Sequence, residues 1–293
     1  MNKNFLLGLA VFLMISPVTA FAEEMDPMTG GESTPSSSLS NNSALTDPSM
    51  PLTPPRTPGR FTLGAETHLL FDKKMDPPEG GNIDTLSVRR SDQFYVVPAY
   101  NIYRDDKSDI DLFAQLGAGS MRVTKGNKTT LIEETTSYDK GFLWGIGVKG
   151  SRKLWDNFSA HFSTRYKEFE SDIDEYTFNG IKAQRLSGST SGRLSEFESA
   201  FLISASTSPE DRDTTYRFYA GPSFTFTKYE QGSVSYLVGS TPVTSGVADS
   251  DQRSAFGVKL GVDMLKFSEA LKISFEATLF AESSVTLSLH YNF

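Results

Sequence analysis

Ten stretches of the chain alternate apolar and polar residues, and this pattern restricts the possible folds more than any other feature of the sequence. Successive side chains of an extended chain point to opposite sides, so a period of two predicts strands with one apolar face. The first stretch is Phe61–Phe71, and the last is VTLSLHYNF, Val285–Phe293. The other eight lie at Phe94–Ile102, Ile110–Leu116, Phe142–Val148, Phe158–Tyr166, Phe197–Ala205, Tyr216–Phe226, Phe256–Met264 and Ile273–Leu279.

The connections between these stretches alternate in length. The short ones are Asp105–Asp109, Ser151–Asn157, Thr207–Asp213 and Leu265–Leu271, and the long ones are Asp72–Asp92, Arg122–Lys140, Lys167–Arg193 and Lys228–Arg253. The last connection, Glu282–Ser284, breaks the alternation, because it is expected on the side of the long loops and is very short. Short turns on one side and longer loops on the other are typical of an up-and-down antiparallel barrel in an outer membrane, where about 10 residues per strand suffice. The sequence therefore predicts an all-β fold, a closed transmembrane β-barrel of about ten strands with four surface loops. A soluble sandwich also alternates, with its apolar face turned inward, and remains the alternative.

The residues before the first stretch predict export. Lys3 precedes an apolar run, Phe5–Ile15, and Ala20-Phe21-Ala22 supplies the small residues of a cleavage site, so 1–22 are expected to be a signal peptide. The following segment, 23–59, is rich in Ser, Pro and Thr and is expected to be a disordered linker before a barrel at 60–293. The chain has no cysteine, which excludes disulfides and a lipoprotein anchor, and its net charge of -8 offers no basic face for nucleic acid.

The last stretch ends on an aromatic residue in the middle of a strand pattern. In a membrane barrel the last strand must pair with the first, because an open sheet edge cannot be satisfied in lipid. This stretch is therefore expected to close the barrel.

Three segments resemble the bacterial outer-membrane β-barrel superfamily, and more specifically its small opacity-like and OmpA-like members. These segments are LSLHYNF, GVKGSRKLWDNFSAHFSTRYKEF, and YVVPAYNIY followed by DLFAQLGAG. The resemblance implies a Gram-negative outer-membrane location and insertion by the outer-membrane assembly machinery, which would read Leu289, Tyr291 and Phe293 as its signal. Members of the small family have eight strands rather than ten. Pro98 and Pro222 lie within two of the stretches, and because proline cannot donate to a ladder, bulges are expected there.

The polar faces of the stretches carry long side chains of both charges. We expect a network in the lumen from Glu66, His68, Asp111, Lys149, His161, Arg165, Glu198, Arg217, Lys259 and Glu276. Eight-stranded barrels are filled by side chains, and buried charges persist only when paired. The sequence thus predicts a lumen plugged by ion pairs.

No catalytic residue, metal ligand or cofactor is assigned. Gly145–Gly150 matches G-x-G-x-x-G, but the motif lies within a strand rather than before a helix, so these glycines are expected to leave room for long interior side chains. His161 and Ser163 share one face and could form a base and nucleophile, and the D-x-D pairs Asp109/Asp111 and Asp172/Asp174 lack an accompanying histidine. The more economical interpretation is a packed interior histidine and solvated carboxylates.

The predicted function is a structural or surface-interaction role through the extracellular loops, without enzymatic activity. The expected partners are outer-membrane lipid and lipopolysaccharide, the assembly machinery, and an extracellular ligand bound by the loops. A narrow porin-like channel for ions or small solutes is the alternative, because the interior is polar.

Overall fold

The computed structural model describes residues 60–77, 83–127, 130–188, 190–207, 214–251, 255–267 and 269–293, without the side chains of 247–249. The expected signal peptide at 1–22 and linker at 23–59 lie outside these residues. Among the described residues, no helix has the length and apolar character needed to cross a bilayer.

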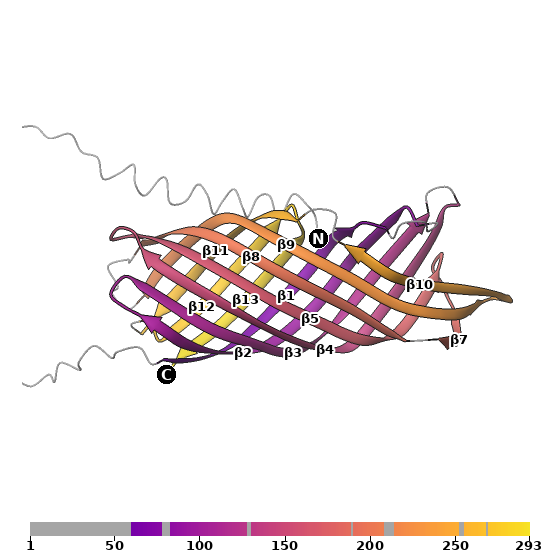
Figure 1. Cartoon of the computed structure of the whole chain (residues 1–293), viewed down its shortest axis with the longest axis horizontal. Coiled ribbons are helices and arrows are strands. Elements are labelled where there is room, and N and C mark those ends of the chain that lie inside the picture. Colours follow the sequence, from indigo (N-terminus) through magenta and orange to yellow (C-terminus); the bar gives the residue numbers. More distant parts are fainter. Residues whose placement is uncertain are drawn as a thin grey trace, which may run out of the picture. The chain divides into compact units, whose positions relative to one another are not determined.

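Thirteen strands form one antiparallel sheet (Figure 1). They are β1 (Phe61–Met75), β2 (Thr85–Arg104), β3 (Ser108–Asn127), β4 (Ile132–Lys153), β5 (Phe158–Phe178), β6 (Ile181–Lys182), β7 (Gln184–Gly188), β8 (Ser191–Thr207), β9 (Thr214–Val238), β10 (Thr241–Asp251), β11 (Phe256–Lys266), β12 (Leu271–Leu279) and β13 (Ser283–Asn292). Ten of them close into a ring in the order β1-β2-β3-β4-β5-β8-β9-β11-β12-β13, with β13 paired to β1. The expected fold class, a closed antiparallel barrel of about ten strands, is confirmed.

The ring closes where the sequence predicted. Thr62 lies opposite Asn292 in the ladder between β1 and β13, and the Phe293 N–H donates to the Phe61 carbonyl oxygen at 2.9 Å. The rings of Phe61 and Phe293 lie 5.9 Å apart. The terminal stretch is therefore the closing strand.

Large apolar side chains form a belt on the outer face of the ring. Nine of the ten ring strands contribute exposed residues such as Phe94, Leu116, Ile146, Phe201 and Leu287, and β12 contributes none. Their immediate neighbours along each strand point inward, which is the arrangement that period two dictates. The inward positions are polar through much of this belt, as in Glu66, Gln115 and Lys259, so the wall is apolar outside and polar inside.

The long connections are mainly strand rather than loop, which differs from the sequence prediction. β3 continues to Asn127 and β4 begins at Ile132, while β9 runs on to Val238 and pairs with β10 in a hairpin. β7 also pairs with β9 in this region, at the end opposite the C-terminus (Figure 1). We call this part of the sheet, which lies beyond the belt at the end opposite the C-terminus, the extension. It comprises β6, β7 and β10 and the ends of β3, β4, β5 and β9 that adjoin them. Its hairpins satisfy backbone groups that loops would leave to water.

The bulges expected at the two prolines are absent. Pro98 keeps regular register with Leu63 of β1, and the ladder to β3 resumes on both sides of it with no shift, from Val96 to Ala99. Pro222 behaves in the same way between β11 and β8. In each case the proline has no N–H to donate, and two residue pairs are missing from one ladder. This gap accommodates the proline, so the strand does not form a bulge.

Inside the barrel, at the end from which the extension rises, the side chains become apolar. The cluster comprises Leu70, Met75, Leu86, Val88, Tyr95, Val97, Met121, Val123, Tyr138, Leu143, Phe169, Leu194 and Tyr229. A second cluster, Tyr176, Val234 and Tyr236, lies in the extension. The rings of Tyr176 and Tyr236 stack with their centroids 3.9 Å apart. The interior is thus a charged region capped by an apolar one.

Candidate functional site

The central group of interior charges is built around Glu198 of β8. Arg165 of β5 places Nη2 2.8 Å from Glu198 and Nη1 3.3 Å from Glu66 of β1. Lys259 of β11 places Nζ 2.6 Å from Glu198 and 2.7 Å from Glu276 of β12. β1 and β5 are not neighbours in the ring, so the Arg165–Glu66 pair crosses the interior. All five side chains were predicted members of the lumen network, and the structure brings them together.

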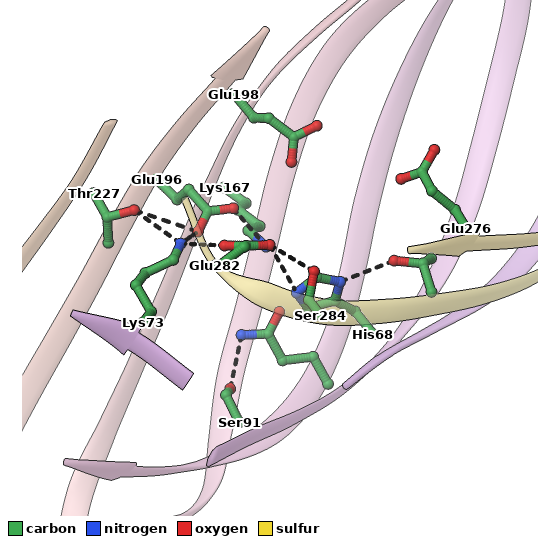
Figure 2. A network of polar contacts seen from close by, with 12 residues as sticks. His68, Lys73, Ser91, Lys167, Glu196, Glu198, Thr227, Glu276, Glu282 and Ser284 are labelled. Atoms are coloured by element: carbon green, nitrogen blue, oxygen red, sulfur yellow. Dashed lines mark hydrogen bonds and ion pairs between the residues drawn. The ribbon is translucent and has the colours of Figure 1, made fainter. Parts of the chain in front are cut away.

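A second group lies next to the central one and is more deeply buried. Lys73 of β1 pairs with Glu196 of β8 and places Nζ 2.6 Å from Glu282 Oε2 (Figure 2). Lys167 of β5 lies 2.7 Å from the other oxygen of Glu196. Two ammonium groups therefore face two carboxylates, and the group is formally neutral. Charges this far from water are tolerated only because each has an opposite partner.

Neutral hydrogen bonds complete the second group. Thr227 Oγ1 accepts from Lys73 Nζ at 3.0 Å, and Ser284 donates to Glu282 at 2.7 Å. His68, one of the predicted residues, lies 2.9 Å from Thr286 Oγ1 and 3.9 Å from Glu282 (Figure 2). These contacts connect β1, β8, β9 and the start of β13, so the group ties the closing strand to the far wall.

The remaining predicted residues lie toward the short-turn end and form separate contacts. Lys149 lies 3.8 Å from Asp111, and Arg217 lies 4.0 Å from Asp263. Asp263 also forms an ion pair with Lys272, whose Nζ lies 3.0 Å from Asp263 Oδ2. The side chains of Lys149 and Lys272 are 37% and 35% exposed, so this end of the interior is open to solvent. The structure therefore brings five of the predicted residues together in one group and places the others in separate contacts.

Four residues of the buried second group were not predicted, namely Lys73, Lys167, Glu196 and Glu282. Lys167 and Glu196 continue the inward faces of Arg165 and Glu198 by one further step of period two, so the pattern could have found them. Lys73 could not be found this way, because a register shift between Leu70 and Asp72 changes which residues of β1 point inward.

The hydrolase arrangement considered for His161 and Ser163 is not formed. His161 Nε2 lies 2.7 Å from the hydroxyl of Ser204 on β8, within the barrel interior. The glycines behave as predicted, since a Cβ on Gly147 would come within 2.4 Å of the Phe113 ring and one on Gly145 within 3.1 Å of Gln115 Oε1. In the described part of the chain, no group of three or more metal-ligating side chains is assembled.

An apolar belt outside, paired charges inside and a ring without open edges together define the class: a transmembrane β-barrel of the outer-membrane type. Several solved structures are similar to this chain at low sequence identity. The translocator domain of the autotransporter NalP from Neisseria meningitidis has 10% identity and a TM-score of 0.41, covering 81% of this chain and 90% of that one. The transport unit of the autotransporter AIDA-I from Escherichia coli has 11% identity, a TM-score of 0.37 and coverages of 83% and 93%. The toluene transporter TodX of Pseudomonas putida has 6% identity, a TM-score of 0.35 and coverages of 79% and 88%. No protein-family model and no curated protein matches the sequence.

Proposed function

We propose that this chain is an integral outer-membrane protein with a structural or surface-interaction role, exerted by the extension, and that its lumen is closed by side chains. The observation that carries the proposal is the set of ion pairs that cross the interior, from Lys73 to Glu196 and from Arg165 to Glu66. Opening a path for ions would separate charges that are paired away from water, which is strongly unfavourable.

The extension supports the surface role. Its hairpin tips are joined, since the Asn179 N–H donates to the Glu133 carbonyl at 2.7 Å and Asn179 Oδ1 accepts from the Glu133 N–H at 2.7 Å. Beside this junction lie Leu131 and Ile181, whose side chains are 83% and 60% exposed. Leu131 also has a φ of 55°, a strained value for leucine. Exposed apolar groups beside a hydrogen-bonded junction of two hairpins suit contact with another surface.

Conductance across a planar bilayer tests the closed lumen. The chain starting at Glu23 and a shorter one starting at Arg60 are inserted, and insertion is verified by the mobility difference between boiled and unboiled samples on an SDS gel. We expect no unit steps from either chain. Stable steps from both would replace the closed-lumen proposal by a channel, and steps from the shorter chain alone would make residues 23–59 the plug.

A narrow channel is the second candidate, and the solvent-exposed side chains at the short-turn end favour it. Lys149 and Lys272 are partly exposed there, so solute could enter the barrel from that side. The apolar cluster and the second group of charges would then have to move. Such a channel would be gated, and conductance would depend on voltage or on a ligand at the extension.

The surface role has its own test, in cells that carry the protein. Leu131→Ser with Ile181→Ser should reduce adhesion or cell–cell contact while leaving the surface level of the protein unchanged. Leu154→Ser, at the short-turn end, is the matched control, because it removes an exposed apolar residue from the opposite side of the membrane. Equal adhesion of all three strains would contradict the surface role.

A further inference from the structure

A shallow hollow of about 130 Å³ lies on the outer wall of the barrel, across β2, β3 and β4. It is lined by Arg90, Asp92, Ser120, Met121, Arg122, Ser137 and Asp139. Arg90 lies opposite Arg122 in the ladder between β2 and β3, and Arg122 lies opposite Ser137 in the next ladder. Two arginines from adjacent strands therefore meet at one place on the outer surface.

The hollow lies at the edge of the apolar belt. Phe94, 52% exposed, follows Asp92 by two residues on β2, and Phe142, 60% exposed, belongs to the same belt on β4. Two residues of a strand span about 7 Å, so the charged side chains begin within one step of the last lipid-facing rings. This end of the barrel carries the extension, and a bilayer that covers the apolar belt would present its headgroups at this height.

The donors of the hollow are only partly used. Arg90 Nε and Nη2 bind Asp92 Oδ2 at 2.8 and 2.7 Å, which orients the guanidinium and leaves Nη1 without a partner among the residues that the structure describes. Within the described part of the chain, Arg122 has no ion pair. Ser120 and Ser137 add hydroxyl groups on either side. A guanidinium fork matches the oxygens of a phosphate group better than any other side chain does.

The charged residues that line the hollow are two arginines and two aspartates. Asp92 is paired with Arg90, so Arg122 faces the hollow beside the single carboxylate of Asp139.

We propose that this hollow binds a phosphate group carried by the headgroup of a membrane lipid, with Arg122 and Arg90 as its ligands. The position at the edge of the belt favours a lipid over free phosphate, because a lipid anchored in the bilayer presents its headgroup at this height. The site rests on the membrane-spanning fold and not on whether the lumen conducts. Its ligand would be a lipid bound to the outer surface of the barrel rather than a solute in the lumen.

Native mass spectrometry of the purified full chain in detergent micelles tests the site. Three probes are compared: a diphosphorylated glycolipid, the same glycolipid after removal of its phosphates, and inorganic phosphate. We expect the phosphorylated lipid to bind at least tenfold more tightly than either other probe. The double variant Arg90→Gln/Arg122→Gln should lose at least tenfold in affinity for it.

Arg152→Gln is the matched control, because Arg152 is an exposed arginine at the opposite end of β4. It should leave lipid binding unchanged, and both variants should retain the mobility shift on heating that marks a folded barrel. If both variants lost the same affinity for the phosphorylated lipid, the binding would reflect general electrostatic attraction of an anionic lipid, and the proposed site would be overturned. Equal binding of the dephosphorylated lipid would overturn the phosphate, and equal binding of inorganic phosphate would overturn the lipid as its source.

Discussion

Lys73 Nζ lies 2.6 Å from Glu282 Oε2, and each side chain is only 1% exposed. This pair joins the first strand of the barrel to the segment that leads into the last one. Lys73 also serves Glu196, so one ammonium group neutralises carboxylates on two sides of the interior. The stability of the barrel should therefore depend on this lysine.

Replacing Lys73 by methionine should lower the free energy of unfolding by about 3–5 kcal/mol, because Glu282 loses its ammonium partner without leaving the interior. The measurement is the urea unfolding midpoint of the protein refolded into vesicles. Lys74→Met is the control, since Lys74 is the next residue and is exposed. Equal midpoints for both variants would show that the buried pair contributes nothing.

Arg165→Ala should also destabilise the barrel by about 3–5 kcal/mol, because Glu66 and Glu198 both lose a partner. Arg193→Ala should cost at most about 1 kcal/mol, since Arg193 is half-exposed and its ion pairs with Glu168 and Glu170 are 3.5 and 3.7 Å long. The two variants are compared by the same unfolding experiment. An unchanged midpoint for Arg165→Ala would remove the central group as a source of stability.

The tyrosine pair of the apolar cluster inside the barrel predicts unequal effects of two substitutions. Tyr138 and Tyr229 place their hydroxyls 2.7 Å apart, and Tyr229 donates to Gln231 Oε1 at 2.9 Å, so Tyr138 must be the donor between the two rings. Tyr229→Phe leaves both Tyr138 and Gln231 without their hydrogen-bond partner and should lower the free energy of unfolding by about 1–3 kcal/mol. Tyr138→Phe removes one donor and should lower it by less. The reverse order in unfolding experiments would show that the hydrogen bonds run the other way.

Lys125 predicts a pH dependence of stability. Burial lowers the pKa of its ammonium group to about 8, with the Glu134 carboxylate acting in the opposite direction. Below this pH both folded and unfolded chains hold the proton, and the cost of burying the charge is paid in full. Between about pH 8 and 10.5 the folded chain releases the proton first, so stability rises with pH.

The expected gain from Lys125 between pH 7.5 and 9.5 is about 2 kcal/mol. It is measured as the difference in unfolding free energy between the wild type and Lys125→Met at the two pH values, which removes the contribution of other groups. A difference that does not change with pH would mean that Lys125 keeps its proton throughout.

The proposed assembly signal predicts a difference between cells and refolding. Phe293→Ala should lower the amount of barrel in the outer membrane severalfold, because the assembly machinery would no longer find its terminal aromatic, while refolding of the purified variant into vesicles should change little. Phe267→Ala, an exposed phenylalanine in a short turn, is the control. Equal membrane levels of both variants would argue against a signal at Phe293.

The sequence was sufficient for the wall of the barrel, because every membrane strand carries an apolar face with period two. It failed for the extension, where the alternation continues with polar outward residues and resembles a loop. The same failure hid Glu196 and Lys167, which lie just beyond the assigned strand ends. Glu282 lies in a connection, and only its contact with Lys73 in three dimensions gives it a role.

The prediction of bulges at the two prolines was wrong for a different reason. Proline removes one donor, and a bulge is one way to accommodate the loss, but a gap in a single ladder is another. Pro98 and Pro222 both use the gap, and the register on either side is set by the rest of the strand. The local rule correctly identified the missing donor of each proline. The paired residues on both sides keep the strand in register, so a gap in one ladder accommodates the proline without a bulge.

The hydrogen bond from Phe293 to Phe61 makes residues 61–293 almost a closed circle in space. A circularly permuted chain, joined between these residues and opened in the turn at 154–157, would keep every strand pair and bury the same charges. It would also move the aromatic strand from the end of the chain to its middle. Closure depends on neighbours in space, whereas the proposed recognition of a terminal strand would depend on linear order, so permutation would separate closure of the barrel from this proposed signal.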